Sequence, residues 1–144
     1  MFNILCNLQI ICKVKLGLPN KSDFLCWLSC IFSFFQKKIE ITIRIVDEKE
    51  ILLLNYNYRG KNISTNILSF PVDTFFELQC GFLGDLIICR QVVEREALIQ
   101  LKSLNMYWAY ILIHGSLHLL GYNHINNREN LEMKNLEYII LNKL

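Results

Sequence analysis

The chain has 144 residues, of which 53% are hydrophobic and 19% are charged, and its formal net charge is +2. This length and composition are typical of one folded domain and exclude a largely disordered protein. The small positive charge does not by itself indicate nucleic-acid binding, so any such contact depends on local basic groups. We therefore expect residues 1–144 to form a single domain.

The cysteines and the apolar segments indicate where in the cell the protein is located. The six cysteines form no C-x-x-C pair and lie mostly in apolar runs, which favours reduced, buried thiols over a disulfide framework. The longest apolar stretch, from Phe24 to Phe35, is too short to span a bilayer, and the N-terminus lacks the basic region of a signal peptide. We expect a soluble cytoplasmic protein that makes no membrane contact.

The first half of the chain is predicted to alternate between strands and helices. The apolar segment 2–10 predicts a strand, and a helix follows it with Ser22 as the N-cap. Alternating isoleucines predict a half-buried strand over 39–46. Acidic residues then begin a helix over 47–58.

In the second half, short strands precede a run of helices. This order predicts an α+β domain with one sheet packed against several helices. The predicted elements are a loop over 59–66, strands over 67–72 and 83–89, and helices over 90–102, 105–120 and 128–141.

All three histidines lie in the segment HGSLHLLGYNH, residues 114–124. On a helix, His114 and His118 project from the same face, one turn apart. Gly121 can adopt a positive φ and turn the chain back, so that His124 supplies a third nitrogen. Three neutral imidazoles with a fourth position open are typical of a catalytic zinc site. We expect one Zn²⁺ per chain, the alternative being three unrelated structural histidines.

The residue after the first histidine separates this site from a large class of zinc peptidases. In H-E-x-x-H peptidases a glutamate at this position activates the zinc-bound water. Here the position holds Gly115, and no acidic residue lies between His114 and His124. We expect a site without an adjacent carboxylate, which favours an anionic substrate such as a phosphodiester and disfavours a peptidase.

The histidine segment resembles the H-G-x-x-H-L-x-G-Y-D-H signature of the YbeY family, bacterial metal-dependent endoribonucleases. The segments YRGKNISTNILSFP and LGDLIICRQVVEREA are similar to the family's two other recognisable blocks, in the same order. The resemblance covers nearly the whole chain. It implies one small mixed β-sheet of about four strands packed with about five helices, and zinc held by His114, His118 and His124 at a zincin-like helix.

Four further residues are candidates for the site. Arg59 matches an arginine that the family uses functionally, which implies contact with RNA phosphate or with the attacked phosphoryl group. Lys61 could assist substrate binding or be an ordinary surface lysine. Asn123 replaces the family's aspartate and keeps an acceptor oxygen without the charge, which weakens any role in orienting a ligand. Asp85 could orient the metal site or cap the segment after it.

The resemblance implies a single-strand-specific, zinc-dependent endoribonuclease with His114 and Arg59 as catalytic residues. Its role would be rRNA processing at the 3′ end of small-subunit rRNA and ribosome quality control, with rRNA, the small ribosomal subunit and ribosomal proteins as partners. Attack by water or by the ribose 2′-OH stays open, and so does the oligomeric state. The alternative is a non-enzymatic ribosome-assembly factor with a structural zinc.

Overall fold

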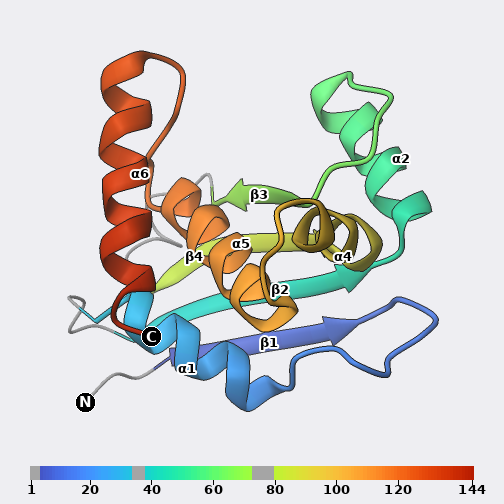
Figure 1. The fold of residues 1–144 in the computed structure, drawn as a ribbon, viewed down its shortest axis with the longest axis horizontal. Coiled ribbons are helices and arrows are strands. Elements are labelled where there is room, and N and C mark those ends of the chain that lie inside the picture. Colours follow the sequence, from blue (N-terminus) through green and yellow to red (C-terminus); the bar gives the residue numbers. More distant parts are fainter. Residues whose placement is uncertain (1–3, 34–37, 73–79) are drawn as a thin grey trace.

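The computed structural model describes residues 4–33, 38–72 and 80–144, which form one four-stranded sheet and five helices (Figure 1). The α+β prediction is therefore confirmed. None of these helices is long and apolar enough to cross a membrane. In chain order the elements are β1 (Ile4–Ile10), α1 (Lys21–Ile31), β2 (Ile39–Val46), α2 (Glu48–Arg59), β3 (Ile67–Pro71), β4 (Phe82–Cys89), α4 (Arg90–Ile99), α5 (Leu104–Leu119) and α6 (Asn127–Leu141).

The sheet is mixed, with strand order β1-β2-β4-β3. β1, β2 and β4 are parallel, and β3 pairs antiparallel with β4 at one edge. In β2 the alternate residues Ile41, Ile43 and Ile45 are buried while the residues between them are half-buried, as the sequence predicted. Residues 2 and 3 of the first predicted strand lie outside the described residues.

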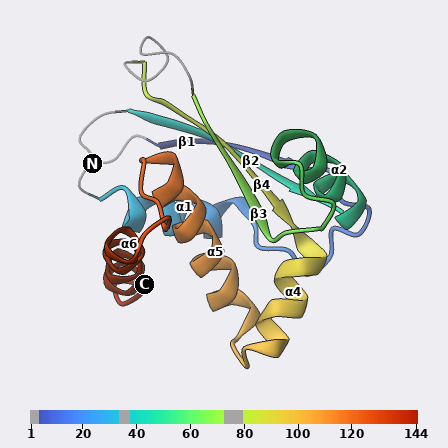
Figure 2. The same cartoon turned by 90° about the horizontal axis from the view of Figure 1, so that it is seen from above.

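Different helices cover the two faces of the sheet (Figure 2). α1, α5 and α6 form the main core with one face, whereas α2 packs against the other face in a smaller core around Ile51 and Leu68. The neighbouring residues Ile87 and Ile88 of β4 contribute to opposite cores. This alternation decides which side chains of β4 can approach α5.

The N-cap of α1 is Asn20, so the prediction of Ser22 was wrong. Asn20 has an extended backbone, and its side chain accepts a hydrogen bond from the Asp23 N–H, while the Asp23 carboxylate accepts one from the Asn20 N–H. This reciprocal pair is a capping box, which satisfies two otherwise unpaired donors. Ser22 lies in the first turn, where its hydroxyl donates to the Asn20 side chain.

All six cysteines are free, as predicted, but not all of them are buried. Cys26 and Cys80 are exposed and Cys30 is partly buried. The helix α1 buries Phe24, Trp27, Leu28 and Ile31, so Cys26 lies on its opposite side. The buried thiols are Cys6, Cys12 and Cys89.

Candidate metal centre

α5 carries two of the histidines across the sheet. It begins after Ser103, whose hydroxyl accepts a hydrogen bond from the Met106 N–H. Beyond its last residue the chain turns at Gly121, which has a φ of 97° and donates its N–H to the carbonyl of His118. The predicted turn at this glycine is confirmed, and it brings His124 back toward the end of α5.

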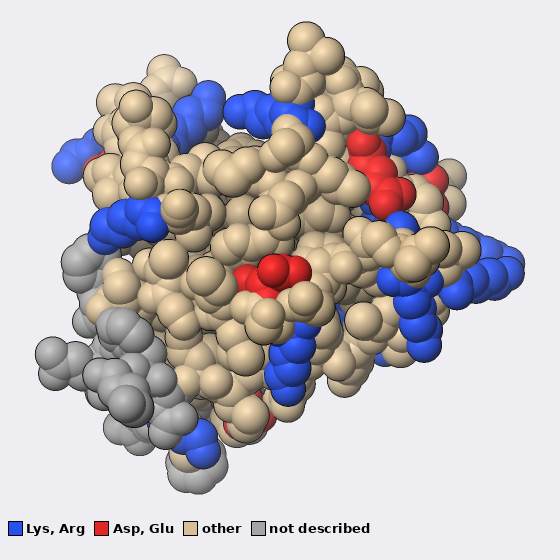
Figure 3. All heavy atoms as spheres, turned by 60° about the horizontal axis from the view of Figure 1, so that its bottom comes forward, with Lys and Arg blue, Asp and Glu red and all other residues tan. Residues whose placement is uncertain are grey.

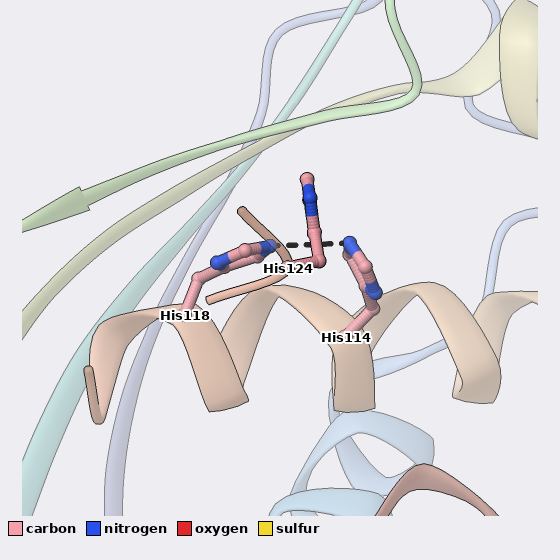
Figure 4. Close-up of side chains that lie close together, drawn as sticks. All are labelled: His114, His118 and His124. Carbon is pink, nitrogen blue, oxygen red and sulfur yellow. Dashed lines mark hydrogen bonds between the residues drawn. The ribbon is translucent and has the colours of Figure 1, made fainter. Parts of the chain in front are cut away.

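The three imidazoles converge on one point (Figure 4). The Nε2 atoms of His114 and His118 are 3.2 Å apart, and one ligand atom from each histidine lies within 4.8 Å of the others. Two nitrogens bound to a tetrahedral zinc ion at about 2.1 Å would lie about 3.4 Å apart. The spacing therefore fits a single metal ion, and the three histidines form a group that can hold one. His124 is exposed, so the group opens to solvent.

His118 is held in the neutral form that a metal requires. Burial lowers its pKa, the neighbouring imidazoles of His114 and His124 lower it further, and the charge of Arg59 acts in the same direction. A hydrogen bond to the Tyr122 backbone opposes these effects. Because protons compete with a metal for imidazole nitrogens, a lowered pKa keeps the ligand available at neutral pH.

A carboxylate does lie next to the histidines, contrary to our expectation. Glu137, on α6, is 5% exposed, and its Oε2 lies 2.6 Å from Nδ1 of His114. Glu137 lies outside the segment 114–124, so the histidine motif alone does not predict it. Its signal is a single acid in the buried stripe of α6, between Met133 and Ile140 at helical spacing. Glu137 contacts the nitrogen that faces away from the cluster, and among the described residues no carboxylate joins the three histidines.

The structure explains why position 115 cannot hold a glutamate. Gly115 packs against the sheet, where an added Cβ would lie 2.4 Å from Cδ1 of Ile67 and 3.0 Å from Cδ2 of Leu86. Its carbonyl accepts a hydrogen bond of 3.2 Å from the Ser69 hydroxyl. A side chain at this position would enter the helix–sheet contact and would not reach the metal ligands.

Arg59 is the last residue of α2 and is exposed, and its charge reaches His118. The chain after it is fixed by Gly60, which has a φ of 67° and donates its N–H to the end of α2. The buried Asn55 donates from Nδ2 to the carbonyl of Ile63 at 2.8 Å. These contacts hold the loop that follows Arg59 and carries Lys61. Both side chains are exposed, and within the described residues neither forms an ion pair.

The structure does not bring Asp85 to the histidines. Asp85 follows Gly84 and precedes Leu86, and Leu86 faces α5, so strand alternation places Asp85 on the α2 face of the sheet. Asn123 lies in the exposed turn before His124. Its Nδ2 donates to the Gly121 carbonyl at 3.4 Å, and no hydrogen bond joins it to a histidine among the described residues.

The fold and the histidine cluster define the class: an α+β protein with a three-imidazole metal-ligand set on and just beyond one helix. The family model of endoribonuclease YbeY matches residues 21–144, and the chain belongs to this family. The solution structure of TM1509 from Thermotoga maritima has a similar fold, with a TM-score of 0.64. It is 24% identical in sequence, and the match covers 93% of this chain and 86% of that one. The family is a nuclease family, so the chain is an enzyme of the hydrolase type.

Proposed function

We propose that this protein is a single-strand-specific, zinc-dependent endoribonuclease that processes the 3′ end of small-subunit rRNA and acts in ribosome quality control. One zinc ion is held by His114, His118 and His124, and residues 1–144 form one catalytic domain. The observation that carries the proposal is the convergence of three imidazoles in a group that opens to solvent at the exposed His124. Zinc is favoured over other divalent ions by the all-imidazole ligand set.

The charges around the cluster support a phosphodiester substrate. Within the described residues no carboxylate joins the group of three imidazoles, so the ligand set itself carries no negative charge. Figure 3 shows lysine and arginine side chains, with acidic side chains among them, at the end that carries α2 and the loop between β1 and α1. Arg59 at the end of α2 and Lys61 in the loop after it are both exposed and can contact a phosphate backbone.

Different residues of the chain have different roles in the proposed cleavage. When bound, the zinc ion supplies a Lewis acid that polarises the scissile phosphate and lowers the pKa of a nucleophile. Arg59 offers two parallel N–H donors to the phosphoryl oxygens as their charge develops, and Lys61 binds the neighbouring phosphate as a point charge. Glu137 is not a base for the nucleophile, because its carboxylate faces Nδ1 of His114 and is buried.

The proposed partners follow from this substrate. They are rRNA and the small ribosomal subunit, with contacts to ribosomal proteins, in the cytoplasm. Asn123 stays in this proposal as a residue near the ligands, since it lies directly before His124, whereas Asp85 is left out because of its place on the α2 face.

Arg59 gives the sharpest test of the catalytic proposal. We expect Arg59→Ala to lower the rate of cleavage of a labelled single-stranded RNA from the 3′ end of small-subunit rRNA by roughly 100-fold, the loss typical for one transition-state donor. Arg59→Lys should recover part of the rate, because it restores the charge without the paired donors. Zinc content, measured for each protein, should stay at the wild-type value because Arg59 is not a ligand.

Lys102→Ala, at the exposed turn between α4 and α5, is the matched control and should cleave like wild type. Equal rates for wild type and Arg59→Ala would contradict the role of Arg59. If zinc-loaded wild type leaves the RNA intact but binds the small subunit, the protein is an assembly factor with a structural zinc. Products with a 2′,3′-cyclic phosphate and a 5′-hydroxyl would assign the attack to the ribose 2′-OH, and a 5′-phosphate would assign it to water.

A further inference from the structure

Glu137 is a buried carboxylate whose position calls for an explanation. It lies on α6 between the buried residues Met133 and Ile140, and its side chain is 7% exposed. Removing a carboxylate from water is costly unless a partner compensates its charge. Its hydrogen-bond partner is His114, which lies 23 residues earlier in the chain on α5. The pair thus joins the last helix to a metal ligand.

The two nitrogens of His114 have different partners. Nδ1 lies 2.6 Å from Oε2 of Glu137, and Nε2 lies 3.2 Å from Nε2 of His118, inside the cluster. With the Glu137 carboxylate as the acceptor of this hydrogen bond, Nδ1 is the donor and carries the proton. The lone pair of a neutral imidazole is then left on Nε2, which points to the other ligands.

We propose that Glu137 is a positioning residue of the metal centre, which fixes the tautomer and ring orientation of His114 and couples the packing of α6 to metal binding. A carboxylate on the distal nitrogen also raises the basicity of the ligating nitrogen, and losing such a partner typically weakens metal binding by about 10 to 100-fold. His118 and His124 have no carboxylate partner among the described residues, so His114 is the ligand that depends on α6.

The inference rests on the proposed zinc site but not on RNA cleavage, so it is tested by zinc binding. We expect Glu137→Met, which keeps the volume but removes the charge, to weaken zinc binding by about 10 to 100-fold in a competition titration against a chromophoric chelator. Glu137→Gln keeps an acceptor oxygen and should lose less. Glu132→Gln, an exposed acid on the same helix, is the matched control and should bind zinc like wild type.

A second readout separates positioning from a structural role. The metal-free Glu137→Met protein should melt near the wild-type temperature, because an apolar side chain of similar volume replaces the buried carboxylate and the His114 side chain, which is 25% exposed, can bond to water instead. Zinc should increase the hydrogen-exchange protection of α6 in wild type and not in this variant. Equal zinc affinity in wild type and both Glu137 variants would overturn the inference. The inference would also be overturned if both metal-free variants lost enough folding stability to account for their weaker zinc binding. Wild type that binds zinc but does not cleave RNA would contradict only the proposed function.

Discussion

Replacing Gly115 with glutamate, which recreates the H-E-x-x-H motif, should remove most or all of the folding stability at 25 °C. The new Cβ would lie 2.4 Å from Cδ1 of Ile67 and 3.0 Å from Cδ2 of Leu86 in a fully packed contact. Overpacking costs roughly 1–3 kcal/mol, and a buried carboxylate without a partner adds several kcal/mol. Because a domain of this kind is stable by only about 5–15 kcal/mol, the sum removes most or all of that stability. Far-UV circular dichroism and thermal melting measure the effect.

Two further variants distinguish overpacking at position 115 from the effect of adding a glutamate to α5. Gly115→Ala should fold but melt at a lower temperature than wild type, because its methyl group overpacks the contact with the sheet. The loss should be small, because the higher helix propensity of alanine, worth about 1 kcal/mol, offsets part of it. Asn105→Glu adds the same side chain at an exposed position of the first turn of α5 and should melt like wild type. A Gly115→Glu protein that melts like wild type would show that α5 does not rest on the sheet as described.

Replacing His118 with alanine should abolish metal binding and RNA cleavage while the protein stays folded. His118 supplies one of three nitrogens, and its Nε2 lies 3.2 Å from that of His114. Losing a residue that hydrogen-bonds to a metal ligand weakens metal binding by up to about 100-fold. Losing the ligand itself should weaken zinc binding by more than this. Its ring is only partly buried, so the cost in folding stability is small. Zinc titration and the single-stranded RNA assay measure the two effects.

Asn123→Asp is the comparison for this variant. It restores the aspartate of the family signature in the exposed turn before His124, where the Asn123 side chain donates a hydrogen bond to the Gly121 carbonyl. We expect its zinc affinity to equal or exceed that of wild type. Tight, stoichiometric zinc binding by His118→Ala would place the ion elsewhere and contradict the three-histidine site.

The histidine cluster could be predicted because its geometry is local. His114 and His118 share one helix, and the turn at Gly121 involves only the residues beside it. The strand over 39–46 was predictable for the same reason, since its burial follows the alternation of its own residues. Helix ends were less predictable. α4 stops at Ile99 and not at residue 102, because Leu101 adopts a φ of 55° and leaves the helix.

The remaining features depend on contacts between distant segments. Glu137 meets His114 only because α6 packs on α5, and its sequence signal is a single acid in an apolar stripe. The face on which Asp85 lies depends on the register of β4 against its neighbours, which a one-residue shift would reverse. Both features follow from tertiary packing, which spacing along the chain does not determine.

The central claim is that one metal ion held by three histidines makes this chain a ribonuclease. Its most direct test is to strip wild-type protein of metal with a chelator, add zinc in steps, and measure cleavage of single-stranded RNA at each step. The account predicts no cleavage without zinc and a rise that levels off at about one zinc per chain, as a single three-ligand site requires. Cleavage by the metal-free protein, or none at any zinc loading, would contradict it.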